Sequence, residues 1–197
     1  MNLHKFFSII IIFLFFISCS KKIEKDNVLK ERSLDLQMIE AYEEGMSSLK
    51  SGDVLFAAKK FNEAEILYPQ SIWAPRSALM AAYSYYLQDY YGDAVAELER
   101  FIKVYPKHEN LDYAYFLLAT AHYEQIVNEK KDLGSLLDAK RNFLFVINNF
   151  SNTDYAIDAK FKLDLIDDTL ASKEMYIGRY YLQQKKWISA INRFRIV

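Results

Sequence analysis

The sequence predicts an all-α solenoid, a stack of helix pairs, and three observations favour this fold class. Five glycines and three prolines in 197 residues leave little of the turn chemistry that an all-β fold needs. A hydrophobic content of 52% is ample for a packed core. The third observation is an internal repeat with a period of 37 residues, which is the sequence signature of a solenoid.

The repeat is carried by small, aromatic and proline residues at fixed positions. In the first unit, spacings of 12, 4, 3 and 5 residues separate a small residue, a second small residue, an aromatic residue, a third small residue and a proline. This order matches the tetratricopeptide pattern, in which small residues sit where two helices cross closely and proline ends the second helix. The matching positions are Gly45, Ala57, Phe61, Ala64 and Pro69 in the first unit, and Ala82, Ala94, Leu98, Phe101 and Pro106 in the second.

A third unit contains an insertion. Its first two small positions are 20 residues apart instead of 12, so eight extra residues fall near 128–135, and we expect a surface loop there. A serine replaces the closing proline, and the polar residues after it offer an N-cap to the next helix. The matching positions are Ala119, Ala139, Phe143, Val146 and Ser151.

The fourth unit is marked by Gly178, Ala190 and Phe194, and its first helix is expected to run over about 154–184. The four repeats are therefore predicted at about 38–70, 75–107, 112–151 and 154–197, within a domain of residues 35–197. The chain stops at Val197, inside the expected second helix, and an uncapped last repeat exposes apolar surface. Either a further repeat is missing or a partner covers this end, and we favour a missing repeat.

The N-terminus resembles the export signal of a bacterial lipoprotein. A basic residue at Lys5 precedes an apolar run over 6–17, which is too short to span a bilayer, and Cys19 follows. We interpret residues 1–18 as a signal peptide, Cys19 as the lipid attachment site and residues 19–34 as a charged tether. The alternatives are an ordinary signal peptide with an incidental cysteine and, for the tether, a lipid-binding basic patch.

Composition and motifs give no support to catalysis or to nucleic-acid binding. The net charge is −1 and the isoelectric point is near 6.3, whereas a nucleic-acid-binding domain normally carries a basic face. His4, His108 and His122 are scattered, and no pair of them has metal-ligand spacing. The chain contains no glycine-rich phosphate loop and no nucleophile elbow. We therefore expect no enzyme, no metal and no cofactor.

A binding groove is expected on the first helices of the first three repeats, because these helices line the concave face of such a superhelix. Aromatic side chains with flanking cations suit an extended peptide that carries aromatic residues and a free carboxylate. The alternative is that many of these aromatics pack between repeats. The expected groove residues are Tyr42, Met46, Lys50, Arg76, Leu79, Tyr83, Tyr86, Tyr113, Phe116, Thr120 and Tyr123.

The chain resembles the BamD (ComL) family of outer-membrane assembly lipoproteins along most of its length. The resemblance is carried by the lipobox at Cys19, the closing Tyr-Pro pairs of the first two repeats and the third-repeat insertion. Four strings in order add to it, namely Ala-Tyr-x-x-Gly at 41–45, Asp-Tyr-Ala-Tyr-Phe at 112–116, Glu-Met-Tyr-Ile at 174–177 and Trp-x-x-Ala at 187–190.

The resemblance implies a non-enzymatic subunit of the β-barrel assembly machinery, lipid-anchored in the outer membrane and facing the periplasm. It implies three kinds of protein partner: the POTRA domains of the barrel subunit BamA, accessory lipoproteins, and the C-terminal signals of unfolded outer-membrane proteins. Carried over by position, the signal falls on the groove, and partner docking falls on Tyr180, Tyr181 and Arg193. The alternatives are a CpoB-like adaptor of the Tol–Pal system and, as an enzyme, a peptidoglycan-cleaving lipoprotein.

Replacing Cys19 tests the anchor. Cys19→Ala is expected to abolish acylation and to release the domain from membranes, because two or three acyl chains anchor far more firmly than one. Palmitate labelling combined with membrane fractionation measures both effects, and a variant that is still labelled would refute this attachment site.

Overall fold

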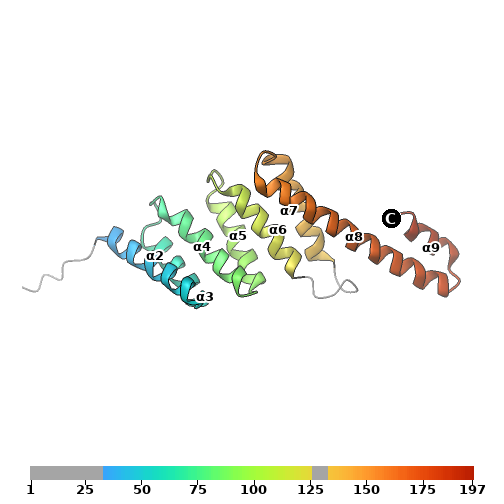
Figure 1. Ribbon diagram of the computed structural model, residues 1–197, viewed down its shortest axis with the longest axis horizontal. Helices are drawn as coiled ribbons and strands as arrows, with labels where there is room; N and C mark the ends of the chain where they lie inside the picture. The colour runs from blue at the N-terminus through green and yellow to red at the C-terminus, as the bar shows by residue number, and fades with distance from the viewer. Residues whose placement is uncertain (1–32, 126–132) are drawn as a thin grey trace, which may run out of the picture. The chain divides into compact units, whose positions relative to one another are not determined.

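The computed structural model describes residues 33–125 and 133–197, and every regular element in these ranges is an α-helix. Each helix packs against the next one in chain order (Figure 1). Taken two by two they form four helix pairs, which confirms the predicted all-α tetratricopeptide-type solenoid. The pairs are α2 (Leu34–Ser51) with α3 (Val54–Leu67), α4 (Trp73–Leu87) with α5 (Tyr91–Val104), α6 (Leu111–Glu124) with α7 (Gly134–Asn149), and α8 (Asp154–Gln183) with α9 (Trp187–Phe194).

Several helices begin and end at the signals that the sequence contains. Ser33, Asp53 and Thr153 each accept a hydrogen bond from the backbone N–H three residues further on, over 3.4, 3.2 and 3.3 Å. These bonds cap α2, α3 and α8 by satisfying one of the N–H groups that a helix leaves unpaired. Pro69 and Pro106 follow the ends of α3 and α5, where a missing N–H prevents the helix from continuing.

The small and aromatic repeat positions face each other across the helix pair. A Cβ atom added to Gly45 would lie 2.8 Å from the ring of Phe61, and one added to Gly178 would meet the ring of Phe194. In the first and fourth pairs the two helices can therefore approach this closely only because the first helix has no side chain at that point. Ala57 and Ala94 are completely buried, as the repeat pattern predicted.

The aromatic residue also fills the space between neighbouring pairs. Phe61 packs with Ala57 of its own pair and with Ala81 of α4 in the next pair. Phe143 likewise shares a core with Ala156 and Ala159 of α8. The core is therefore a continuous series of small clusters, each shared by two successive pairs, as in a solenoid.

Helix α8 connects two packing environments. Its first half lies against α6 and α7, where Ala159 and Ile166 are buried. Its second half pairs with α9 through Gly178. The long helix predicted over 154–184 is thus confirmed as a 30-residue α-helix.

Three expectations need correction. Helix α2 begins at Leu34, so the domain starts before residue 35, because Ser33 caps it. Gly134 and Ser135 belong to α7 and not to the insertion loop, since glycine is tolerated in a first turn whose N–H groups have no intrahelical partner. Helix α9 ends at Phe194, so Val197 lies outside it.

The signal peptide, Cys19, the tether up to residue 32 and insertion residues 126–132 lie outside the described residues. None of the helices in the described ranges combines the length and apolar composition needed to cross a membrane.

A glycine pair tests the close crossing. Gly178→Ala is expected to destabilise the fold by about 1–3 kcal/mol, because the new methyl group overlaps the ring of Phe194. Gly92 is the matched control, since a Cβ atom there meets nothing within 4 Å and alanine favours the helix. Thermal melting followed by circular dichroism measures both variants. Equal losses at the two sites would contradict the steric explanation.

Lys60 is half-buried at the contact between α3 and α2. Its side chain is only 18% exposed, and its ammonium group contacts Glu44 at 2.8 Å and Glu63 at 2.9 Å. These hydrogen bonds raise the pKa of Lys60. Lys60 therefore links α3 to α2, and neighbouring Lys59 is the exposed position.

Candidate functional site

The first helices of repeats one to three enclose a pocket of about 360 Å³, here called the groove pocket. Five of the eleven expected groove residues line it. Residues 76, 79, 80 and 83 project into it together because side chains three and four positions apart share one face of a helix. The lining residues are Tyr42 from α2; Arg76, Leu79, Met80 and Tyr83 from α4; Asn110; and Tyr113 from α6.

Arg76 provides a cation at the groove pocket. Its guanidinium group lies 5.5 Å from the ring centroid of Trp73 and 3.8 Å from the carboxylate of Glu109. The Arg76 side chain is still 47% exposed, and that of Glu109 is 71% exposed. An exposed ion pair of this length is weak, so the guanidinium group can exchange Glu109 for the carboxylate of a ligand.

Aromatic contacts fix the walls of the groove pocket. Tyr42 packs edge-on against Phe61 at 5.3 Å and against Trp73 at 5.1 Å between ring centroids. Tyr113 contacts Tyr155 at 5.3 Å. Burial raises the pKa of Tyr113, so its hydroxyl group stays protonated and can donate a hydrogen bond near neutral pH. The pocket therefore offers rigid apolar surfaces, phenol groups and one cation.

Three expected groove residues on α2 and α4 lie outside the groove pocket. Met46 packs against the buried core around Phe61, and Lys50 is exposed in the last turn of α2. Tyr86 contacts the ring of Tyr91 at 5.7 Å, and burial raises the pKa of Tyr86. Met46 and Lys50 are not brought together with Tyr83, whereas Tyr86 packs with Tyr83 against the same core cluster without lining the pocket.

The other three, on α6, mainly pack within the solenoid. Thr120 is buried and donates a hydrogen bond of 2.8 Å to the backbone carbonyl of Phe116. The ring of Phe116 lies 5.8 Å from that of Phe143, and Tyr123 lies 4.8 Å below the ammonium group of Lys162. At these positions the alternative interpretation, packing between helices, describes the structure better.

Sequence reasoning missed Met80 and Asn110. Met80 lies four residues after Arg76 and three before Tyr83, so helical spacing could have identified it as a residue of the same face. Asn110 precedes α6, and its backbone N–H donates to Nδ1 of His108 at 3.2 Å. Its position between two helices depends on the loop after Pro106, for which the sequence contained no signal beyond the proline.

The expected docking residues differ in exposure. Tyr180 is 53% exposed at the end of α8, and its ring contacts that of Tyr181 at 5.9 Å. Tyr181 is half-buried, with the ammonium group of Lys186 5.9 Å from its ring centroid. Trp187 is also exposed at the start of α9. Aromatic surface therefore gathers where α8 turns into α9.

Arg193, the third expected docking residue, is paired with a carboxylate of its own repeat. Its guanidinium group donates to both carboxylate oxygens of Glu174, over 3.1 and 3.3 Å. The pair joins α9 to α8, because Glu174 lies 19 residues earlier in the chain and one turn before Gly178. Arg193 thus has a structural partner within its own repeat, and its replacement affects packing as well as surface charge.

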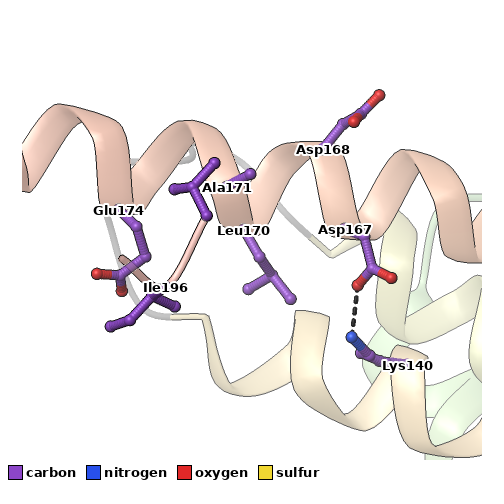
Figure 2. A pocket seen from close by; sticks show the side chains of 8 residues that line it. Lys140, Asp167, Asp168, Leu170, Ala171, Glu174 and Ile196 are labelled. Atoms are coloured by element: carbon purple, nitrogen blue, oxygen red, sulfur yellow. Dashed lines mark hydrogen bonds and ion pairs between the residues drawn. The ribbon is translucent and has the colours of Figure 1, made fainter. Parts of the chain in front are cut away.

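A second cavity of about 600 Å³ lies between α7, α8 and the residues after α9 (Figure 2). Leu170 and Ala171 of α8 contribute apolar surface, and Lys140 of α7 forms an ion pair with Asp167. Figure 2 shows that the Asp168 side chain points away from the ion pair between Lys140 and Asp167. Because its cation is already paired, this cavity offers no free positive charge to a ligand.

A third cavity, of about 390 Å³, surrounds an ion pair between α3 and α5. Arg100 donates to both carboxylate oxygens of Glu65, over 2.8 and 2.6 Å, and Tyr105 donates to Glu65 at 2.7 Å. Burial, followed by the hydrogen bond to Glu65, raises the pKa of Tyr105. Every group in this network is satisfied, so its role is to join the first two repeats.

The described residues contain no group of three or more His, Cys, Asp or Glu side chains that could hold a metal ion. His122 is partly buried, and this burial lowers its pKa, so the imidazole is neutral near pH 7. It has no nucleophile or carboxylate hydrogen-bonded to it in these ranges.

Together, the four helix pairs define a tetratricopeptide-repeat protein whose first helices carry an aromatic pocket with one cation. A structural neighbour agrees with this class: the first TPR of Spaghetti (RPAP3), bound to an HSP90 peptide. The match has a TM-score of 0.53 and 18% identity, and covers 69% of this chain and 94% of that one. A likeness at this level concerns the fold alone.

Sequence relatives give the family. A family model described as YfiO, outer membrane lipoprotein, matches residues 34–197. The outer membrane protein assembly factor BamD of Caulobacter vibrioides is 37% identical over 91% of this chain and 58% of its own length. The BamD protein of Rickettsia prowazekii is 40% identical over 79% of this chain and 62% of its own length. The BamD protein of Neisseria gonorrhoeae is 31% identical over 81% of this chain and 63% of its own length. The chain belongs to the BamD (YfiO) family.

This chain spans about three fifths of the length of these relatives. Family membership associates it with the outer membrane. The relatives give no support to the Tol–Pal alternative.

Proposed function

We propose that this chain is a non-enzymatic scaffold subunit of the machinery that inserts β-barrel proteins into the outer membrane. Membership of the BamD family supports this function, since the relatives named above are outer membrane protein assembly factors. The observation in the structure that carries the proposal is the groove pocket, because a solenoid can act by holding a polypeptide.

The N-terminal part of the proposal is a lipid anchor. Cys19, acylated after removal of residues 1–18, would hold the protein at the periplasmic face of the outer membrane, with the residues between Cys19 and Ser33 as a tether. The family description as an outer membrane lipoprotein supports this assignment. The anchor would keep the solenoid at the membrane where barrels are inserted.

The groove pocket suits the C-terminal signal of an unfolded outer-membrane protein. Its volume of about 360 Å³ lies at the lower end of the range of roughly 300–1,000 Å³ that is typical of ligand pockets. Tyr42, Tyr83 and Tyr113 offer stacking surfaces to an aromatic side chain, and Arg76 faces the solvent where a terminal carboxylate can pair with it.

The C-terminal repeat is proposed to dock the POTRA domains of the barrel subunit BamA, with accessory lipoproteins nearby. Tyr180 and Trp187 support this role, because exposed Tyr and Trp side chains frequently dominate binding energy at interfaces. Tyr181 and Arg193 would act behind this surface, Tyr181 as a partly covered wall and Arg193 by fixing α9 on α8.

Peptide capture is tested with a peptide that ends in an aromatic residue and a free carboxylate. Tyr83→Ala is expected to weaken binding by roughly thirtyfold, since removing an interface anchor commonly costs about 2 kcal/mol. Tyr86→Ala is the matched control on the same helix, because Tyr86 lies outside the groove pocket. Fluorescence anisotropy measures both affinities, and equal losses would refute this binding site.

The role of Arg76 has its own readout in the same assay. Arg76→Gln should abolish the preference for a free carboxylate over a C-terminal amide, because a neutral amide side chain cannot pair with the charge. If the preference survives in this variant, the carboxylate of the peptide pairs with another cation. Lys50 of α2 would then be tested next.

Docking is tested by pull-down of the barrel subunit. Tyr180→Ala is expected to reduce capture at least tenfold without lowering the melting temperature, because more than half of the side chain is exposed. Arg193→Glu should lower the melting temperature, since it places a carboxylate against Glu174, and the additional change Glu174→Arg should restore it. Unchanged capture by Tyr180→Ala would place the docking surface elsewhere.

A further inference from the structure

Helix α8 is apolar on two opposite faces. At 100° per residue, Ala159, Ile166 and Leu170 share the face that packs against α6 and α7. Ile157, Phe161 and Leu165 lie on the opposite face, and they are 53%, 66% and 51% exposed. A helix on the surface of a soluble protein normally presents polar residues on that side. We call these three residues the α8 stripe.

Two residues of the α8 stripe occupy the repeat positions of Leu79 and Tyr83, which line the groove pocket in repeat two. Counted from the residue that closes each repeat, the tenth residue is Leu79 in repeat two, Phe116 in repeat three and Phe161 in α8. The fourteenth residue gives Tyr83, then Thr120, then Leu165. The tenth residue after the closing Pro69 is Leu79, the tenth after Pro106 is Phe116, and the tenth after Ser151 is Phe161.

The surfaces of α6 and α8 are in contact. Tyr155, in the first turn of α8, lies 5.3 Å from the ring of Tyr113 and 5.4 Å from the ring of Phe116. Tyr113 lines the groove pocket, so an unbroken series of aromatic rings leads from the pocket to the start of α8. The start of α8, just before the α8 stripe, therefore adjoins the first-helix surface of repeats one to three.

Carboxylates border the α8 stripe. Asp158, Asp164 and Asp168 are exposed, and none of them forms an ion pair within residues 33–125 and 133–197. Asp168 points away from the ion pair between Lys140 and Asp167 (Figure 2). These three carboxylates outnumber the two nearby lysines, Lys160 and Lys162, and Lys162 already lies 4.0 Å from Glu124. The charge at this end of the surface is thus opposite to that of Arg76 at the pocket.

We infer that the α8 stripe is a second subsite of the peptide groove, which binds a segment containing apolar and basic residues upstream of the carboxylate-terminated end. This inference rests on the peptide-binding function proposed above. Phe161 and Leu165 would cover an apolar side chain of the peptide, while Asp158 and Asp164 pair with flanking Lys or Arg side chains. The opposite charges of the two ends fix the direction of the bound peptide.

Helix spacing gives the length of that peptide. Helices α4, α6 and α8 pack in sequence, and packed helices lie about 8–10 Å apart, so about 16–20 Å separates α4 from α8. An extended chain covers about 3.3 Å per residue, so about six residues connect the two subsites.

The experiment compares three synthetic peptides that share the C-terminal sequence Tyr-Gly-Phe with a free carboxylate and a Gly-Ser spacer of about six residues. One has no further residues, one carries the head Lys-Leu-Lys and one carries the head Glu-Leu-Glu. The complete chain should bind the Lys-Leu-Lys peptide at least tenfold more tightly than the headless peptide, and the Glu-Leu-Glu peptide no more tightly than the headless one.

Two variants and their controls assign the gain to α8. Phe161→Ser and Asp158→Lys should each remove most of the tenfold gain while leaving the affinity for the headless peptide unchanged. Ile66→Ser is the matched apolar control, because Ile66 is 75% exposed on α3, and Asp93→Lys is the charge control on α5. Both controls should keep the full gain.

The outcomes separate the two proposals. If the headless peptide binds but the heads make no difference, or if Phe161→Ser retains the gain, the second subsite is refuted and the groove pocket stands. If the headless peptide fails to bind the wild-type chain, the groove pocket is refuted. In that case the α8 stripe would still be supported as a binding surface if the Lys-Leu-Lys peptide binds the wild-type chain and Phe161→Ser removes this binding.

Discussion

The close crossing of the two helices in each repeat is the constraint on which the rest of the structure depends. Gly45 lies against Phe61 and Gly178 against Phe194, at distances that leave no room for a side chain on the first helix. The same aromatic ring then reaches the next pair, as Phe61 does with Ala81. One contact therefore sets both the geometry within a repeat and the stacking between repeats, because a closely packed interior transmits the position of each element to its neighbour.

This stacking creates the groove pocket. No single repeat contains it, since Tyr42, Arg76 and Tyr113 come from three successive first helices. Edge-on contacts with Phe61 and Trp73 hold Tyr42 in place, so the walls of the pocket are fixed by the same core that holds the repeats together. A preorganised aromatic surface loses less side-chain entropy when a peptide binds, which favours affinity.

Helix α8 separates two kinds of surface. Its first half adjoins the first-helix face of repeats one to three, whereas its second half pairs with α9 and carries Tyr180. The ion pair between Arg193 and Glu174 keeps α9 on this second half. Peptide capture and partner docking are therefore assigned to opposite ends of one 30-residue helix, which gives a scaffold a direct physical connection between its two proposed roles.

The sequence by itself determined the repeat, the four helix pairs, the long α8 and the Thr153 cap, because these follow from local rules of helix period, residue size and capping. It also placed Tyr42, Arg76, Leu79, Tyr83 and Tyr113 on one face. Only the tertiary structure decided that Thr120 and Phe116 pack inward, that Asn110 joins the pocket and that Arg193 meets Glu174. The physical reason is that a helical period fixes the direction of a side chain from its own axis, whereas the neighbouring helices decide whether that direction leads to solvent, to a partner side chain or into the core.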